Sequence, residues 1–135
     1  MIIRKATIKD AESLANLDKI AYREIKGWAL QSKRNFEKTL GNKKFYFLMS
    51  LEKNRDIAYL ESEYDKEKDA VWLKNIYVMK EFRKKNIAKH LIKKCSNYWR
   101  KKTNIIILLT ADRNFKIFEK LGFNKTMNYM VKIIK

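Results

Sequence analysis

The stretch that decides the fold runs from Ile76 to Ala88 and reads IYVMKEFRKKNIA. An apolar, strand-forming segment leads directly into a basic turn, and an amphipathic helix starts where the turn ends. This order presents free backbone N–H groups and the positive end of a helix dipole to a bound anion. The sequence therefore predicts an anion site suited to the pyrophosphate of a nucleotide cofactor.

Length and composition indicate one globular domain over residues 1–135. An apolar content of 46% with 13% aromatic residues argues against disorder. Residues 1–7 contain no apolar leader core, and the uncharged run over residues 104–111 is too short to span a bilayer. The single cysteine, Cys95, excludes an internal disulfide. We therefore expect a cytoplasmic protein without a membrane segment.

The chain is strongly basic, with 32 lysine and arginine residues against 15 acids and a formal net charge of +17. Such a charge favours an anionic partner, either a nucleic acid, an acidic protein or a phosphorylated cofactor. Lysine greatly outnumbers arginine and proline is absent, which also fits a general compositional bias. The local cluster near Glu81 is therefore better evidence, and its members are Lys80, Arg83, Lys84, Lys85, Lys89, Lys93 and Lys94.

Hydrophobic periodicity predicts the element order β-α-α-β-β-β-α-β-α-β. The predicted strands cover residues 2–6, 44–52, 56–64, 71–78, 104–109 and 127–134, and the predicted helices follow Thr7 or Asp10 and cover 32–40, 86–99 and 112–121. Strands 44–52 and 56–64 form an antiparallel hairpin. The segments 71–78, 86–99 and 104–109 form a βαβ unit, which requires parallel strands and a right-handed crossover. We therefore predict an α/β fold with a mixed sheet.

With this order of elements, the chain resembles the GNAT N-acetyltransferase superfamily over essentially its whole length. Residues 2–11 resemble the opening strand and helix of that family. The acyl-CoA signature of the family, Q/R-x-x-G-x-G/A, is matched by Arg83-Lys84-Lys85-Asn86-Ile87-Ala88. The end of the family pattern is matched by Phe118-Glu119-Lys120-Leu121-Gly122-Phe123 and by a terminal strand around Tyr129-Met130-Val131-Lys132.

The resemblance implies a GNAT-like fold in which antiparallel N-terminal strands join a parallel, splayed β-α-β cofactor unit. It also implies acetyl transfer from acetyl-CoA to a primary amine by direct attack, without a covalent enzyme intermediate or a metal. The implied contacts to the co-substrate come from Ile76, Tyr77, Val78, Arg83, Lys84, Lys85, Asn86, Ile87, Ala88, Asn114 and Phe118. A backbone N–H near Val78 would stabilise the developing oxyanion.

The chain departs from the family pattern at three positions. Asn86 replaces the first glycine of the signature, and asparagine is the non-glycine residue that best tolerates a left-handed backbone. Phe118 replaces a tyrosine whose hydroxyl can protonate the departing thiolate. Ala111 replaces an asparagine that faces the cofactor, and Asn114 lies one helical turn later as a candidate substitute.

Candidates for the proton transfers come from the strand beside 71–78 and from the last strand. Glu61 and Glu63 are candidate general bases that would pass a proton through water, although either carboxylate could merely offset nearby lysines. Tyr129 is a candidate proton donor in place of Phe118. We interpret Cys95 as a small apolar residue of a half-buried helix and His90 as a solvated surface residue.

Two other functions remain open at this point. The chain could be a CoA-binding regulator of the same fold with weak catalysis, which the loss of the tyrosine at position 118 favours. It could also bind a nucleic acid through the basic helix face of Lys85, Lys89 and Lys93, although no RNA-reading motif accompanies these lysines. The acceptor, either a peptide or a small amine, stays open, and so does the choice between a monomer and a homodimer.

Overall fold

The computed structural model describes residues 1–126 and 130–134. Its strands are β1 (Ile2–Lys5), β2 (Phe45–Glu52), β3 (Arg55–Asp65), β4 (Ala70–Val78), β5 (Ile105–Leu108), β6 (Asn124–Lys125) and β7 (Met130–Ile133). Its α-helices are α1 (Ala11–Glu24), α2 (Lys33–Leu40), α3 (Ile87–Trp99) and α4 (Phe115–Lys120). Short 3₁₀ turns cover Ile8–Asp10, Lys80–Phe82 and Asp112–Asn114.

The described strands form one mixed sheet in the order β1-β2-β3-β4-β5-β7-β6. Strands β1 to β4 are antiparallel neighbours, β4 and β5 are parallel, and β5, β7 and β6 are again antiparallel. The parallel pair is connected through α3, as the sequence predicts for a βαβ unit. The predicted α/β class with a mixed sheet is therefore confirmed.

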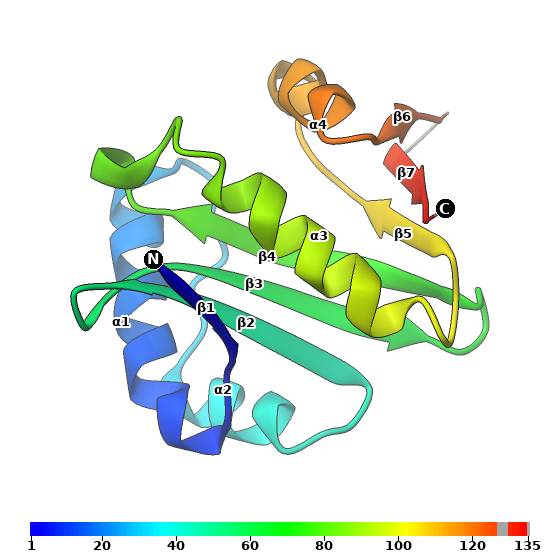
Figure 1. The fold of residues 1–135 in the computed structure, drawn as a ribbon. Coiled ribbons are helices and arrows are strands. Elements are labelled where there is room, and N and C mark those ends of the chain that lie inside the picture. The colour runs from blue at the N-terminus through cyan, green and yellow to red at the C-terminus, as the bar shows by residue number, and fades with distance from the viewer. Residues whose placement is uncertain (127–129, 135) are drawn as a thin grey trace.

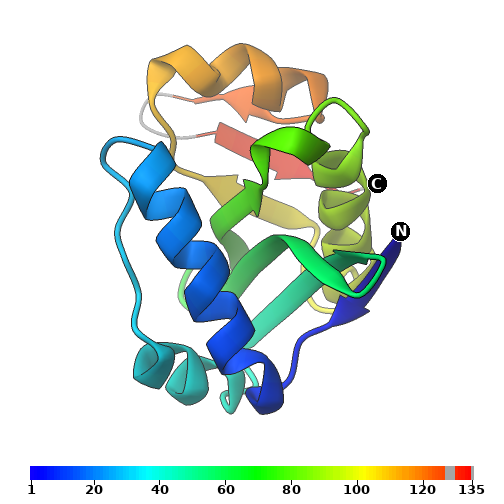
Figure 2. The ribbon, with the colours of Figure 1, turned by 90° about the vertical axis from the view of Figure 1, so that its left-hand side faces the viewer.

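Different helices cover the two faces of the sheet, with α3 on one face and α1 and α2 on the other (Figures 1 and 2). Alternation along β3 shows the division, because Leu60 packs in the cluster around α3 and Tyr59 packs in the cluster around α1. The predicted apolar stripe of α3 is buried at Ile87, Leu91, Ile92, Cys95 and Trp99. Burial also raises the pKa of the Cys95 thiol to about 12, so this cysteine stays protonated.

A β-bulge interrupts the pairing of β3 with β4 in the middle of the sheet. Glu61 is paired with Asn75, but the next residue, Ser62, is paired with Leu73, so Lys74 is an extra residue on β4. A bulge of this kind changes the direction of the neighbouring side chains. Both Lys74 and Asn75 therefore contact carboxylates of β3, at Glu63 and Glu61 respectively.

Strands β4 and β5 diverge soon after they meet. Their parallel pairing covers only Val71 with Ile106 and Trp72 with Ile107, whereas β3 accompanies β4 as far as Val78. Figure 1 shows β5 and α4 leaning away from the end of β4 that leads into α3. Among residues 1–126 and 130–134, no strand pairs with residues 73–78 of β4 on the side of β5. The predicted splay of the cofactor unit is present.

Most predicted boundaries agree with the structure to within a residue or two, and the differences lie near the C-terminus. The predicted helix over 112–121 is a 3₁₀ turn followed by the six-residue helix α4. The prediction omitted β6, because two polar residues carry no strand pattern, and β7 lies between β5 and β6. Residues 127–129 of the predicted last strand lie outside the described residues.

Candidate active site

The basic turn before α3 contains two residues in the left-handed backbone region. Asn86 has φ 61° and ψ 20°, and Lys84 has φ 67°. The first helical hydrogen bond runs from the His90 N–H to the Asn86 carbonyl at 3.1 Å, so the N–H groups of residues 87–89 precede the helical ladder. Residues 83–86 are exposed, which leaves this helix start accessible. The expectation that asparagine supports the left-handed turn is confirmed.

The side chain of Arg83 binds to other parts of the protein. Its Nη2 lies 2.5 Å from Oε2 of Glu24 on α1, and its Nε donates to the Val78 carbonyl at 2.9 Å. The guanidinium also lies 5.6 Å from the ring centroid of Tyr77. Arg83 therefore connects the basic turn to α1 and to the end of β4. The neighbouring Lys84 and Lys85 are also exposed, and neither is in an ion pair among the described residues.

Glu24 receives a second hydrogen bond, from the Tyr77 hydroxyl to Oε1 at 2.6 Å. Partial burial opposes ionisation of Glu24, but the hydrogen bonds from Tyr77 and Arg83 outweigh it and hold the pKa of this carboxyl below its usual value. Glu24 is therefore an anion that joins the end of α1 to β4 and to the basic turn. Sequence reasoning did not select it, because Glu24 and Arg83 lie far apart in the chain.

Glu61 is the buried carboxylate at the β-bulge, with 3% of its surface exposed. Its Oε1 accepts hydrogen bonds from Gln31 Nε2 at 2.9 Å and from Asn75 Nδ2 at 3.0 Å. Burial raises the pKa of Glu61 despite these two donors. Because both hydrogen bonds reach Oε1, Oε2 is the oxygen available for a proton.

Glu63 differs from Glu61, although both lie on β3. Its Oε2 lies 3.0 Å from Lys44 Nζ and its Oε1 lies 3.3 Å from Lys74 Nζ. Both oxygens are therefore engaged by ammonium groups. Of the two predicted base candidates, Glu61 has the environment of a proton acceptor and Glu63 has that of a paired structural carboxylate.

Asp18 organises the segment between α1 and α2. This fully buried carboxylate accepts hydrogen bonds from Trp28 Nε1 at 2.8 Å, from Tyr59 Oη at 2.7 Å and from the Gln31 backbone N–H at 2.6 Å. The segment is thereby held so that Gln31 also reaches Glu61. Sequence reasoning missed Asp18, although a carboxylate one helical turn after the core residue Leu14 was an available signal.

The structure describes two of the three site residues that the sequence predicts in the C-terminal region. Asn114 is half-buried and its Nδ2 donates to Thr110 Oγ1 at 3.0 Å. Phe118 packs at the edge of the α3 core with its ring centroid 5.9 Å from that of Phe123. Tyr129, the predicted proton donor, lies outside the described residues. Its role and that of Asn114 stay predictions.

Two other features are absent from residues 1–126 and 130–134. No group of three or more His, Cys, Asp or Glu side chains is placed to hold a metal ion. No helix is both long enough and apolar enough to cross a membrane.

Comparisons with known proteins identify the family of this chain. The sequence model of the acetyltransferase (GNAT) domain matches residues 42–125, and the chain therefore belongs to the GNAT family. No curated protein matches the chain. GNAT proteins are acetyl-CoA-dependent N-acetyltransferases, so this class of acyltransferase is the class of the present chain, with acetyl-CoA as co-substrate.

Solved structures share the fold over nearly the full chain. PaiA N-acetyltransferase from Thermoplasma acidophilum, crystallised with coenzyme A, is 19% identical with a TM-score of 0.82, and the match covers 98% of each chain. An aminoglycoside 6′-N-acetyltransferase complexed with coenzyme A is 14% identical with a TM-score of 0.84, covering 100% of this chain and 98% of that chain. A ribosomal-protein-alanine N-acetyltransferase from Brucella melitensis is 18% identical with a TM-score of 0.79, covering 99% and 100%.

Proposed function

We propose that the basic turn over residues 83–88 binds the pyrophosphate of acetyl-CoA and that the edge of β4 at Ile76, Tyr77 and Val78 binds the pantetheine amides. The observation that carries this proposal is the early end of the β4–β5 pairing at Trp72, because it leaves the edge of β4 free for another hydrogen-bonding partner. The left-handed turn at Asn86 supports it by placing the start of α3 beside exposed cations.

Glu61 is the proposed general base, and the acceptor amine approaches from the face of the sheet covered by α1 and α2. Glu61 packs on that face, where Gln31 of the α1–α2 segment reaches it. A carboxylate whose pKa is raised by burial accepts a proton more readily near neutral pH than an ordinary one. Glu61 is paired with Asn75 beside the bulge, and Asn75 lies in the part of β4 beyond the residues that pair with β5.

The transfer consists of one exchange of bonds. The acceptor nitrogen forms a bond to the carbonyl carbon of the thioester, and the bond from that carbon to sulfur breaks. Glu61 receives the proton from nitrogen, directly or through a water molecule. Solvent supplies the proton to the departing sulfur, because Phe118 has no proton to donate. Positioning and backbone N–H groups near Val78 provide the remaining acceleration.

A second candidate function is a CoA-binding regulator with the same fold. The observation in its favour is the packing of Phe118 against Phe123, which places a ring without a hydroxyl where the family pattern has a proton donor. A regulator would bind acetyl-CoA tightly and release no thiol when amines are added. Phe118→Tyr separates the two functions, because it should raise the turnover of an enzyme and leave a regulator inactive.

The direct test combines binding and turnover. Calorimetry with acetyl-CoA measures binding, and thiol release in the presence of a panel of amines and peptides measures transfer. The proposal expects binding that weakens with salt, because lysines of the turn contribute to it, and thiol release that depends on the amine. Absence of acetyl-CoA binding by the folded protein would overturn the proposed function.

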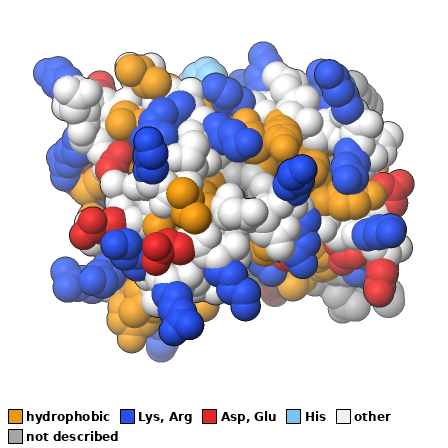
Figure 3. Space-filling model, turned by 90° about the horizontal axis from the view of Figure 1, so that it is seen from below, with side chains coloured by type: hydrophobic (Ala, Val, Ile, Leu, Met, Phe, Trp, Pro, Cys, Tyr) orange, Lys and Arg blue, Asp and Glu red, His pale blue; other side chains and the backbone are white. Residues whose placement is uncertain are grey.

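The proposal also includes a cytoplasmic location, because acetyl-CoA is an intracellular metabolite, and a monomeric or homodimeric state. Binding of an anionic macromolecule through the basic surface is a secondary part of the proposal. On the face shown in Figure 3, Lys and Arg side chains are spread among hydrophobic and uncharged atoms and do not gather in one stripe. Sedimentation of the purified protein would determine the oligomeric state.

A further inference from the structure

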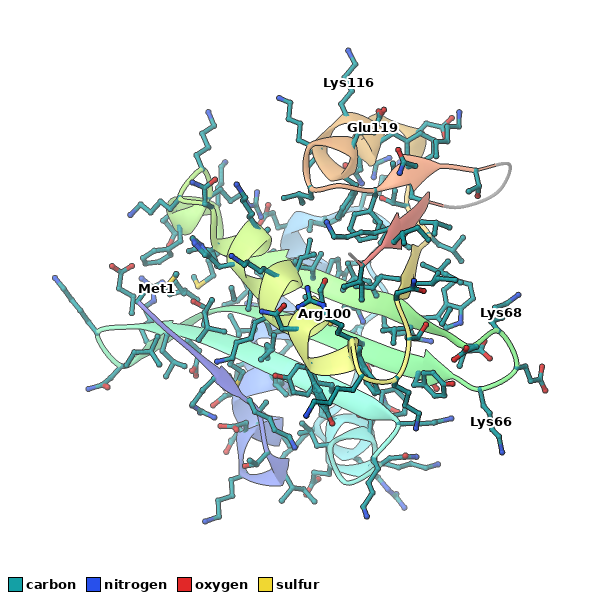
Figure 4. The ribbon with its side chains drawn as sticks, turned by 45° about the vertical axis from the view of Figure 1, so that its right-hand side comes forward. Met1, Lys66, Lys68, Arg100, Lys116 and Glu119 are labelled. Atoms are coloured by element: carbon teal, nitrogen blue, oxygen red, sulfur yellow. The ribbon has the colours of Figure 1, made fainter. Side chains whose placement is uncertain are left out.

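A groove of about 690 Å³ lies beside the proposed acceptor site and is open to solvent. It extends from the β3–β4 turn at Lys66 and Glu67, along Trp72 and Lys74 of β4, to Leu109 after β5. Figure 4 shows Lys66 projecting from the tip of that turn. The groove has the volume of a ligand site, but its length along β4 and its openness suit an extended chain better than an enclosed small molecule.

Strand β4 connects the groove to the residues assigned to the chemistry. Lys74, in its wall, is followed in the chain by Asn75, which donates to the proposed base Glu61. Leu109 directly follows the end of β5, the strand that separates from β4 after Trp72. We infer that a chain lying in the groove along β4 would extend past Lys74 toward Asn75 and Glu61. The inference rests on the proposed function for this end of the groove.

The lysines and the carboxylates that line the groove differ in how far they are already engaged by partners within the protein. Four lysines and three carboxylates line it. The carboxylate of Glu63 is bound between Lys44 and Lys74, one ammonium group to each oxygen. The carboxylate of Asp65 accepts Trp72 Nε1 at 2.9 Å and the backbone N–H groups of residues 67 and 68.

The carboxylates of Glu63 and Asp65 are therefore occupied, and the third, Glu67, lies exposed in the β3–β4 turn. Lys44 and Lys74 keep N–H donors that the single carboxylate of Glu63 cannot satisfy. Lys44 and Lys74 share Glu63, and their side chains are 52% and 45% exposed. An anionic group in the groove would find the ammonium groups of Lys44 and Lys74 within the lining. A cationic group would meet them as repulsive neighbours, and the net charge of +17 would oppose its approach from a distance.

We propose that the acceptor is a peptide segment with a free amine and with acidic side chains next to that amine, which bind Lys44 and Lys74 in this groove. The amine lies at the Glu61 end and loses its proton there during transfer. The acidic side chains lie over Trp72 toward the β3–β4 turn. Polycationic amines such as aminoglycosides are poor acceptors for such a groove, although an aminoglycoside acetyltransferase shares the fold.

The test compares three peptides of equal length with the same free N-terminal residue, followed by glutamates, by uncharged residues or by lysines. Thiol release from acetyl-CoA gives kcat/KM for each peptide, and calorimetry in the presence of CoA gives peptide binding independently of turnover. We expect the acidic peptide to exceed the lysine peptide by about tenfold or more in both measurements, since two ion pairs of modest strength are involved. The difference should shrink as salt is added.

Variants of the lysines test whether the preference for the acidic peptide arises in the groove. Lys44→Glu combined with Lys74→Glu should abolish or reverse the preference. Lys116→Glu combined with Lys120→Glu, on α4, changes the net charge equally and should preserve it, because Lys116 lies far from the groove (Figure 4). If the double groove variant does not fold, as circular dichroism would show, Lys74→Ala alone should still reduce the preference several-fold.

Three results would overturn the inference. Equal binding and turnover of the three peptides would do so, as would preference for the lysine peptide. A preference unchanged by the groove variants would also do so. Each of these leaves the proposed acetyl transfer intact, whereas absence of acetyl-CoA binding would overturn the proposed function itself.

Discussion

Gln31 Nε2 donates a hydrogen bond to Glu61 Oε1 at 2.9 Å, and this contact joins the segment between α1 and α2 to the middle of the sheet. The backbone N–H of Gln31 is in turn bound to the buried carboxylate of Asp18. The orientation of the proposed base and the position of the segment that faces the acceptor therefore depend on each other. Changes at Asp18 should affect both the stability of the fold and the use of the acceptor.

Asp18→Asn should destabilise the protein by about 2–4 kcal/mol, because an amide group would direct its own N–H toward one of three donors that now share two carboxylate oxygens. Urea unfolding measures the change. Tyr59→Phe is the control, since it removes a single hydrogen bond to Asp18 and should cost about 1 kcal/mol. A cost for Asp18→Asn no larger than that of the control would contradict the role assigned to Asp18.

Glu61→Gln should leave the protein as stable as the wild type in acid and make it more stable at neutral pH. Burial raises the pKa of Glu61 in the folded state, so its protonated form favours folding below the ordinary carboxyl pKa and this benefit is lost as pH rises through the raised value. Glutamine mimics the protonated form at every pH. The gain at neutral pH amounts to about 1.4 kcal/mol per unit of pKa elevation.

Thermal or urea unfolding at several pH values measures this difference. Glu63→Gln serves as the control, because it removes the partner of two lysines and should destabilise the protein slightly, by about 0.5–1 kcal/mol. A Glu61→Gln variant that is less stable than the wild type at neutral pH would show that the carboxylate form supports the fold.

Asn86→Gly should preserve or strengthen acetyl-CoA binding, and Asn86→Val should weaken it by about tenfold. A β-branched residue resists the left-handed backbone by about 1–2 kcal/mol, so valine would shift the turn away from its present geometry. Asn97→Val is the matched control, because Asn97 is exposed within α3. Calorimetric affinities that are equal for valine and glycine at position 86 would contradict the assigned turn.

Arg83 and Lys84 should respond differently to replacement by alanine. Arg83→Ala removes the ion pair to Glu24 and the hydrogen bond to the Val78 carbonyl, so it should lower stability by about 0.5–2 kcal/mol and weaken acetyl-CoA binding indirectly. Lys84→Ala should weaken binding, most clearly at low salt, without lowering stability. Melting temperature and calorimetric affinity are measured for both variants. Equal losses of stability in the two variants would contradict the assignment of a structural role to Arg83 and a binding role to Lys84.

The sequence predicts the elements whose patterns are continuous and whose contacts are local. Alternating and apolar runs indicate β2, β3, β4 and β5, and the basic turn before α3 is marked by Asn86 in a glycine position. Asparagine indicates a left-handed turn because this preference belongs to the residue itself. The parallel β4–β5 pairing follows because a helix must connect two parallel neighbours.

The remaining features depend on contacts between distant parts of the chain. Glu24 and Arg83 meet only because the end of α1 lies beside the end of β4, and Asp18 finds Tyr59 only across the α1–sheet interface. The sequence also offers Glu61 and Glu63 as equivalent bases. The folded structure distinguishes them: Glu61 is buried and accepts two hydrogen bonds at Oε1, whereas Glu63 is held between two lysines.

The most direct test of the account is the pH dependence of acetyl transfer in the wild type and in Glu61→Gln. Amine-dependent thiol release from acetyl-CoA should rise with pH in the wild type through a pKa above the ordinary glutamate value. Glu61→Gln should bind acetyl-CoA normally, lose about 10²–10⁴-fold in turnover and lack this pH step, whereas Glu63→Gln should retain it. A Glu61→Gln variant with wild-type turnover and an unchanged pH profile would contradict the assignment of Glu61 as the base.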